Sequence, residues 1–423
     1  NCVATASTWR TREEKSWIFY DWANSAYSVV ITASILPIFF KTMAKAGGIN
    51  PNMADSYWGY ANSAATLIVA ILAPILGTIG DYRGKKMQLF RFFFIIGVLS
   101  TAALSFTDQW ALILIIYMVT IVGFSAANLF YDAFLIDVTS AERMDLVSTY
   151  GFALGYIGGS TIPFIISIGL ILFGSKIGIG SSLAVKISFM LTAVWWTVFA
   201  VPMLKNVKQI YYIESEENII GKSFLRLYKT FMNIREYKSV FIFLLAYFFY
   251  IDGVNTIIRM ATVYGDSVGV GSNSLLLALL MTQIVAFPFA IIYGKLAKKV
   301  GTRNMLLIGI VMYIIICFVA YNMKSAVEFW ILAFLVATSQ GGIQALSRSY
   351  FGKMIPKEKA NEFFGFYDIF GKFAAIMGPA LYAFFSQITG QSRYGVLSVM
   401  LLFIVGGGIM LFAVPRDANN IIP

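Results

Sequence analysis

Long apolar runs alternate with short polar loops along almost the whole chain. Each run has about 20 residues or more, the length with which an α-helix crosses roughly 30 Å of hydrocarbon. Six runs precede one longer polar stretch, at residues 17–40, 56–80, 87–106, 111–136, 146–174 and 183–204. Six more follow it, at residues 239–263, 273–296, 304–322, 327–349, 361–387 and 394–414. The pattern therefore predicts twelve membrane-spanning helices, which are numbered as spans 1 to 12 in chain order.

The bilayer restricts the fold class further. Unpaired backbone groups cannot face lipid, and these runs are too long and too evenly apolar for barrel strands. We expect an all-α integral membrane protein with six spans in residues 1–204 and six in residues 239–423. The linker, residues 205–238, contains basic and aromatic residues at helical spacing. This spacing predicts an amphipathic helix on the cytoplasmic face, and a solvated tether is the alternative.

The two sets of spans are related by an internal repeat. The segment GTIGDYRGKK, Gly77 to Lys86, returns as GKLAKKVGTR, Gly294 to Arg303, and both pairs of matching glycines are 217 positions apart. A second echo has a separation of 216, and it matches Glu142, Gly155 and Pro163 with Glu358, Gly371 and Pro379. Internal duplication in a chain with many spans is typical of secondary transporters, whose two halves move about a site between them.

Composition and charge agree with this interpretation. Hydrophobic residues make up 59% of the chain and charged residues 13%, and the mean hydropathy is +0.76, all outside the range of soluble domains. The net charge of +11 comes from basic residues dispersed among alternate loops, which indicates membrane orientation rather than nucleic-acid binding. Both termini and the linker are therefore expected to be cytoplasmic, in a bacterial inner membrane or an organelle membrane.

Several chemistries have no sequence support. The chain has no histidine, so proton transfer must depend on carboxylates. It has no GxxxxGK[ST] loop, no metal-ligand cluster and no GxSxG motif. We therefore expect that the protein is not an enzyme and that it binds no cofactor or metal. The expected partners are a small-molecule solute and membrane lipids, with no nucleic acid, and the chain is expected to be a monomer.

The repeated segment resembles a known motif. Twelve spans in two halves, with GxxxDxxGKK between spans 2 and 3, resemble the major facilitator superfamily. Two departures stand out: Tyr82 occupies the usual arginine position, and Lys298 replaces the acid in the second copy. Asp81 is expected to accept hydrogen bonds from the N-terminus of a neighbouring helix, where the dipole favours an anion. Asp81 and Arg83 are therefore predicted gating residues.

The start of span 1 narrows this resemblance. FYDWANSAY, Phe19 to Tyr27, is similar to the signature of the Atg22-like, or vacuole effluxer-like, branch of that superfamily. The resemblance implies an amino-acid-like substrate moved by alternating access, with proton coupling as a possibility of this mechanism. Two alternatives stay open: a transporter of lipid-like or amphipathic solutes, and a non-transporting intramembrane enzyme or lipid-handling scaffold.

Acidic residues within the spans are the first candidates for function. Asp21 and Asn24 in span 1 are echoed by Asp252 and Asn255 in span 7, and residues three apart share a helical face. Charges inside a membrane are costly and usually face a cavity or a partner, which favours Asp252 as a proton-coupling residue. Asp21 lies near the cytoplasmic start of its span, so simple solvation is an alternative. The resemblance implies that spans 1 and 7 line the central cavity.

Other polar positions also occur in matched pairs. Asp132 and Arg348 are 216 positions apart and oppositely charged, which predicts a contact between the halves; local pairing with nearby charges is the alternative. Asp368 and Lys372 are four residues apart on span 11, a spacing that predicts an ion pair between them. The alternative is that Lys372 is an unpaired cation that binds an anionic solute. Arg259 can bind a substrate carboxylate or extend to the outer interface.

The predicted site residues fall into three groups. Predicted substrate contacts are Asn24, Tyr27, Asn128, Asp252, Asn255, Arg259, Gln283, Gln340, Gln344 and Lys372. Predicted proton-coupling residues are Asp252, Asp21 and Asp368, and predicted gating residues are Asp81, Arg83, Asp132 and Arg348.

Overall fold

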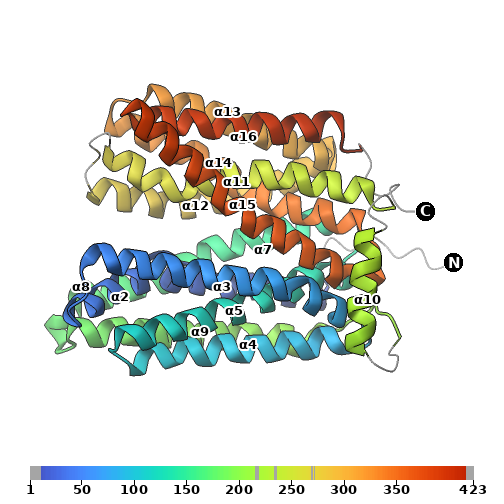
Figure 1. Ribbon diagram of the computed structural model, residues 1–423, viewed down its shortest axis with the longest axis horizontal. Helices are drawn as coiled ribbons and strands as arrows, with labels where there is room; N and C mark the ends of the chain where they lie inside the picture. The colour runs from blue at the N-terminus through green and yellow to red at the C-terminus, as the bar shows by residue number, and fades with distance from the viewer. Residues whose placement is uncertain (1–10, 215–218, 233–235, 268–269, 271, 416–423) are drawn as a thin grey trace.

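A computed structural model describes residues 11–214, 219–232, 236–267, 270 and 272–415. Within these residues, twelve helical stretches are long and apolar enough to cross a membrane, which confirms the predicted spans. They are arranged as two bundles that lie side by side, with spans 1 to 6 in the N-terminal half and spans 7 to 12 in the C-terminal half (Figure 1).

The N-terminal half contains both continuous and broken spans. Span 1 consists of α1 (Arg12–Tyr27), η1 (Ser28–Ser34) and α2 (Ile35–Ala46); span 2 is α3 (Pro51–Gly80); span 3 is α4 (Lys85–Ala103) with η2 (Leu104–Phe106). Span 4 is α5 (Trp110–Ala133) with α6 (Leu135–Val138); span 5 consists of α7 (Met144–Leu154), η3 (Gly155–Thr161), α8 (Ile162–Phe173) and η4 (Gly174–Ile177); span 6 is α9 (Ser181–Asn206).

The linker and the C-terminal half follow. The described part of the linker includes α10 (Ile219–Met232), which lies across the end of the N-terminal bundle and reaches the start of α15, at the right of Figure 1. Spans 7 to 12 are α11 (Lys238–Ser267), α12 (Ser272–Val300), α13 (Thr302–Asn322), α14 (Ala326–Met354), α15 (Ala360–Thr389, after η5, Lys357–Lys359) and α16 (Ser392–Phe412). The end of the bundle at which α10 lies is called the linker end.

Spans 1 and 5 are interrupted by π-helical turns, η1 and η3. In span 5, a Cβ atom added at Gly158 would lie 2.0 Å from the ring of Trp22, and one at Gly159 would lie 2.6 Å from the Trp22 carbonyl oxygen. Small residues allow helices to approach this closely. The two glycines therefore serve close packing between spans 1 and 5.

Two seams join the halves, and the repeated glycines explain both. Span 2 packs on span 11 of the other half, and span 8 packs on span 5. A Cβ atom at Gly77 would lie 2.3 Å from the carbonyl oxygen of Asn361, and one at Gly294 would lie 2.1 Å from the hydroxyl oxygen of Thr149. The repeat in the sequence therefore encodes the same close helix crossing twice, once at each seam.

We predict that Gly77→Ala destabilises the protein, because the added methyl group meets backbone atoms that cannot move independently. Overpacking of this kind costs about 1–3 kcal/mol. Gly169→Ala, in α8, is the matched control, since a Cβ atom there meets nothing within 4 Å. The midpoint of thermal unfolding of the purified protein is the measurement. Equal midpoints for the two variants would show that the span 2 to span 11 crossing tolerates a larger residue.

Candidate functional site

Asp81 lies at the linker end, where span 2 of the N-terminal half meets span 11 of the C-terminal half. Its side chain is completely buried. One carboxylate oxygen accepts hydrogen bonds from the backbone N–H and the side-chain amide of Asn361, at 2.8 and 2.9 Å. The other accepts from the backbone N–H of Glu362, at 3.3 Å. These N–H groups belong to the first turn of α15, so the carboxylate occupies the helix N-terminus that favours an anion.

The linker supplies the cation for this carboxylate. Arg226 of α10 donates to Asp81 at 2.6 Å and to Glu362 at 2.9 Å, and its guanidinium lies 5.3 Å from the centre of the Tyr82 ring. Burial raises the pKa of Asp81 to about 7, and Arg226 opposes that rise. Asp81, Arg226, Asn361 and Glu362 form the Asp81 cluster. Sequence reasoning missed Arg226; the tyrosine at the usual arginine position was the available signal.

Arg83 was predicted to share this gating role, and the structure places it outside the Asp81 cluster. Its guanidinium is exposed and lies 3.7 Å from the exposed carboxylate of Glu214, on the surface of the linker. Its guanidinium also lies 5.2 Å from the centre of the Tyr212 ring, so its contacts are with the linker. Arg226, and not Arg83, therefore provides the guanidinium next to Asp81.

A second cluster surrounds Arg348 of α14. This side chain is 4% exposed and donates to Asp132 of α5 at 2.8 Å and to Asp21 of α1 at 3.2 Å. It also donates to the Ser148 hydroxyl at 3.0 Å, and its guanidinium lies 4.6 Å from the centre of the Trp17 ring. The predicted contact between Asp132 and Arg348 is present, and Asp21 is buried in it rather than solvated. The alternative local partners of Asp132 are occupied, because Arg143 binds Glu14 and Lys353 binds Asp145.

A third cluster, centred on Asp145 at the start of α7, was not foreseen. Its carboxylate accepts from Lys353 at 2.7 Å, from the Thr302 hydroxyl at 2.6 Å and from the Ser349 hydroxyl at 2.5 Å. All three donors belong to the C-terminal half. The second copy of the repeated loop carries Lys298 where the first carries Asp81, and the acid at this seam comes instead from the opposite half. The correspondence of Asp145 with Asn361, 216 positions apart, was the signal that could have revealed it.

The three clusters share one location and one electrostatic pattern. Each lies at the linker end, and each joins aspartates of the N-terminal half to donors of the C-terminal half or the linker. Removing one partner of a buried ion pair costs about 3–5 kcal/mol, because the other charge is left without compensation. The described residues thus hold the halves together at the linker end through several buried charges.

Polar residues also lie deeper between the halves. The side-chain amide of Asn24 donates to Asn128 at 2.8 Å, which joins spans 1 and 4. Gln344 contacts Tyr156, and its amide also donates to the Gln340 carbonyl at 3.0 Å. Asp132 also interacts electrostatically with Asp368, which is therefore close to the Arg348 cluster.

Asp368 and Lys372 form an ion pair on α15, and each side chain is about one-fifth exposed. This geometry matches the self-neutralising arrangement predicted from their spacing. The pair is thus partly exposed, to about the same degree as Asp132 of the Arg348 cluster, whose side chain is 26% exposed.

Asp252 faces span 11 within the C-terminal half. The side chain is completely buried, and both carboxylate oxygens accept from the backbone N–H of Gly378, at 2.9 and 2.8 Å. Gly378 precedes Pro379, which lies inside α15 and lacks an N–H group. Asn255, one turn further along α11, is half-buried, and Arg259 is exposed and interacts with both Tyr117 and Asp252.

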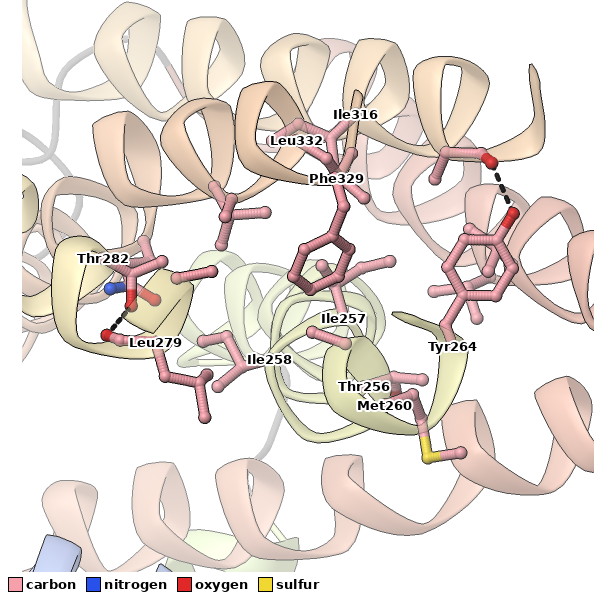
Figure 2. A pocket seen from close by; sticks show the side chains of 18 of the residues that line it. Thr256, Ile257, Ile258, Met260, Tyr264, Leu279, Thr282, Ile316, Phe329 and Leu332 are labelled. Carbon is pink, nitrogen blue, oxygen red and sulfur yellow. Dashed lines mark hydrogen bonds between the residues drawn. The ribbon is translucent and has the colours of Figure 1, made fainter. Parts of the chain in front are cut away.

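An apolar pocket lies inside the C-terminal half (Figure 2). Its walls come from α11 to α16, and the ring of Phe329 projects into it towards Ile257. The predicted contacts Gln283 and Gln340 both line this pocket. Gln340 is 4% exposed and its amide nitrogen is buried without a hydrogen-bond partner. These two residues therefore belong to a space separate from the Asn24 and Asn128 pair.

Tyr27 is a predicted contact that the structure places in a buried, aromatic environment. Its ring is 1% exposed and stacks on Phe124, with the centroids 4.2 Å apart. The hydroxyl group bonds to Thr120 at 2.7 Å. Its observed contacts are those of a packing residue in the N-terminal half.

Comparisons with known proteins agree with this architecture. Residues 10–419 match a protein family described as vacuole effluxer Atg22 like. The chain is 55% identical to a Bacillus subtilis protein named uncharacterized MFS-type transporter YxiO, over 97% of this chain and 96% of that protein. It is 23% identical to autophagy-related protein 22 of Saccharomyces cerevisiae, over 92% of this chain and 89% of the yeast protein.

A solved structure shows the same fold at low sequence identity. The proton:xylose symporter XylE of the major facilitator superfamily aligns with a TM-score of 0.72 and 12% identity, covering 96% of each chain. The alignment extends over both halves of the molecule. The twelve-helix fold predicted from the sequence is therefore confirmed.

We predict that Asp81→Asn and Arg226→Gln loosen the Asp81 cluster. Each removes a charge-assisted hydrogen bond worth about 1–3 kcal/mol. Amide hydrogen exchange should therefore accelerate, by about tenfold for each 1.4 kcal/mol, in α10 and in the first turn of α15. Mass spectrometry of peptides that cover residues 219–232 and 360–366 is the measurement.

Lys229→Gln provides the control, because Lys229 is an exposed cation of the same helix that is not part of the Asp81 cluster. It removes one charge without touching Asp81. Exchange that is unchanged in both test variants, or equally faster in the control, would show that Arg226 does not hold the two halves together.

Proposed function

The chain belongs to the vacuole effluxer Atg22-like family of major facilitator superfamily transporters, and from this premise we propose that it is a secondary active transporter of a small organic solute. The observation that carries the proposal is the gathering of three buried ionic clusters at one end of the two halves. In an alternating-access carrier, such clusters act as a gate that is closed in one state and broken in the other.

We infer that the linker end is cytoplasmic, because basic residues concentrate in its loops. With this orientation, the structure corresponds to a state that is closed towards the cytoplasm. Opening requires separation of Asp81 from the N-terminus of α15, of Arg348 from its two aspartates, and of Asp145 from Lys353. The energy for that separation must come from binding a solute or a coupling ion more tightly in the other state.

Asp252 is the proposed proton-coupling residue. The aspartates of the gate are neutralised by arginine or lysine, and Asp368 by Lys372, whereas Asp252 receives its hydrogen bonds from the neutral Gly378 and Thr256. The same helix, α15, carries the N–H groups that bind Asp81 and the N–H group that binds Asp252. Protonation of Asp252 weakens its hydrogen bonds to α15. Because the same helix binds Asp81, a movement of α15 transmits this change to the gate.

The proposed solute is amino-acid-like. Arg259 is exposed between the halves and suits a carboxylate, and the partly exposed Asp368 and Lys372 pair can exchange with the charges of a zwitterion. The solute class also rests on the family to which the chain belongs. A second candidate, a lipid-like or amphipathic solute, is favoured by the apolar pocket lined by Phe329 and Gln340.

We predict the orientation from the charge distribution. In a protein with Cys2→Ser, a cysteine introduced as Lys222→Cys in α10 should be protected from an impermeant thiol reagent added to intact cells. Lys176→Cys, at the opposite end, should react. The native Cys317 is buried and contributes little background. The reverse labelling pattern would overturn the proposed orientation.

We predict that Asp252→Asn abolishes uphill accumulation while exchange persists. Amino acids are first screened for thermal stabilisation of the purified protein, and those that bind are tested in proteoliposomes. An imposed pH gradient should drive accumulation in the wild type and not in the variant, because the variant carries no titrating group at this position. Counterflow without a gradient should continue in both.

Asp368→Asn is the companion variant, since Asp368 is an alternative predicted coupling residue and its side chain is about one-fifth exposed. Accumulation that survives Asp252→Asn and fails with Asp368→Asn would move the coupling site to span 11. Equal accumulation in both variants would contradict proton coupling through these carboxylates.

A further inference from the structure

A basic pocket lies at the linker end, on the outside of the N-terminal half. It is formed where the first turns of α4 meet the end of α9 and the residues that follow it. Its lining contains four cations, Arg83, Arg91, Lys205 and Lys208, and no acidic residue. The gate uses none of these four. Four like charges around one hollow repel one another, so the pocket is most stable with an anion inside.

The walls of this pocket are fixed by buried interactions. Asp137 forms an ion pair with Lys86 at 2.6 Å, and both side chains are completely buried. The other oxygen of Asp137 accepts from the backbone N–H groups of Ile210 and Tyr211, at 2.8 and 3.0 Å, which holds the linker against span 4. Arg91 donates to the Leu204 carbonyl at 3.1 Å, and this bond joins the two helices. The cations are therefore presented on a preformed surface rather than on free loops.

The surface next to the pocket is apolar. On α4, Phe92, Ile95 and Leu99 follow Arg91 towards the middle of the bundle, and each is more than half exposed. On α9, Val194 and Val198 precede Lys205 and are also more than half exposed. Spans 3 and 6 pack side by side, so these side chains form one apolar strip that begins at the cations. A ligand that fits has a charged head and a hydrocarbon tail.

We propose that this pocket binds the headgroup of an anionic phospholipid from the leaflet at the linker end, with its acyl chains along α4 and α9. Phosphate is the chemistry that the cations recognise, since Arg forms two parallel hydrogen bonds to it and Lys acts as a point charge. Basic pockets between membrane helices on the cytoplasmic side are suited to such headgroups. A zwitterionic lipid should bind more weakly, because its own positive charge is repelled by the four cations of the pocket.

The position of the pocket links lipid binding to the gate. Arg83 and Gly84 line the pocket and directly follow the gate residue Asp81 and its neighbour Tyr82. The linker residue Ile213 donates its N–H to the Asp81 carbonyl at 2.8 Å and accepts from the Arg83 N–H at 3.0 Å. A headgroup bound to Arg83 and Lys208 therefore rests on the same backbone that positions Asp81.

The test uses the full chain in detergent and compares two matched double variants. Lys205→Gln with Lys208→Gln removes two pocket lysines, and Lys298→Gln with Lys299→Gln removes two exposed lysines at the same end of the C-terminal half, outside the pocket. Native mass spectrometry measures retention of phosphatidylglycerol against phosphatidylcholine. The pocket variant should bind phosphatidylglycerol about fivefold more weakly for each charge removed, and the control variant as the wild type does.

A second experiment distinguishes binding of the whole lipid from binding of a soluble phosphate group. The wild type is titrated with glycerol 3-phosphate and with inorganic phosphate, and thermal unfolding is followed in each case. Phosphatidylglycerol should raise the unfolding midpoint at concentrations where neither soluble anion does, because only the lipid covers the apolar strip. Equal stabilisation by inorganic phosphate, or equal loss of phosphatidylglycerol in the two double variants, would overturn the proposal.

Discussion

The closed arrangement of the two halves depends on one buried carboxylate. Asp81 has no contact with water and is satisfied by two backbone N–H groups, one amide and one guanidinium, all contributed by other parts of the chain. A buried carboxylate with fewer partners would be costly, so this position is stable only when α3, α10 and α15 meet. Gly77, one turn earlier, provides the room that brings span 11 within reach.

The other contacts extend this principle across the interface. Asp21, Asp81, Asp132 and Asp145 all belong to the N-terminal half, and the cations that meet them, Arg226, Arg348 and Lys353, belong to the linker or the C-terminal half. The two halves therefore share a fold but carry different charges at their interface. Because these aspartates and these cations lie on opposite sides of the interface, closing satisfies several charges together, and a partly open state leaves some of them buried without partners. This pattern favours two discrete states over a continuous range.

Some features of this arrangement follow from the sequence, and others do not. The spans follow from hydrocarbon thickness, and the pairing of Asp132 with Arg348 follows from their symmetric positions and opposite charges. Asp81 was identifiable because its loop recurs at the same place in the second half. Arg226 was not, because one basic residue in a basic linker looks the same whether it orients the protein or binds a buried aspartate. The partner of Asp252 is the N–H group of Gly378, next to the proline inside α15, and helical periodicity does not specify this contact.

The most direct test of the account measures distances at both ends of the molecule in one protein. Spin labels replace the exposed Gln88 and Lys299 at the linker end, and Lys176 and Lys324 at the opposite end. In lipid nanodiscs, Arg348→Gln should lengthen the first distance and shorten the second, since it removes the cation that holds Asp21 and Asp132. Unchanged distributions at both ends, or lengthening at both, would contradict a two-state gate at the linker end.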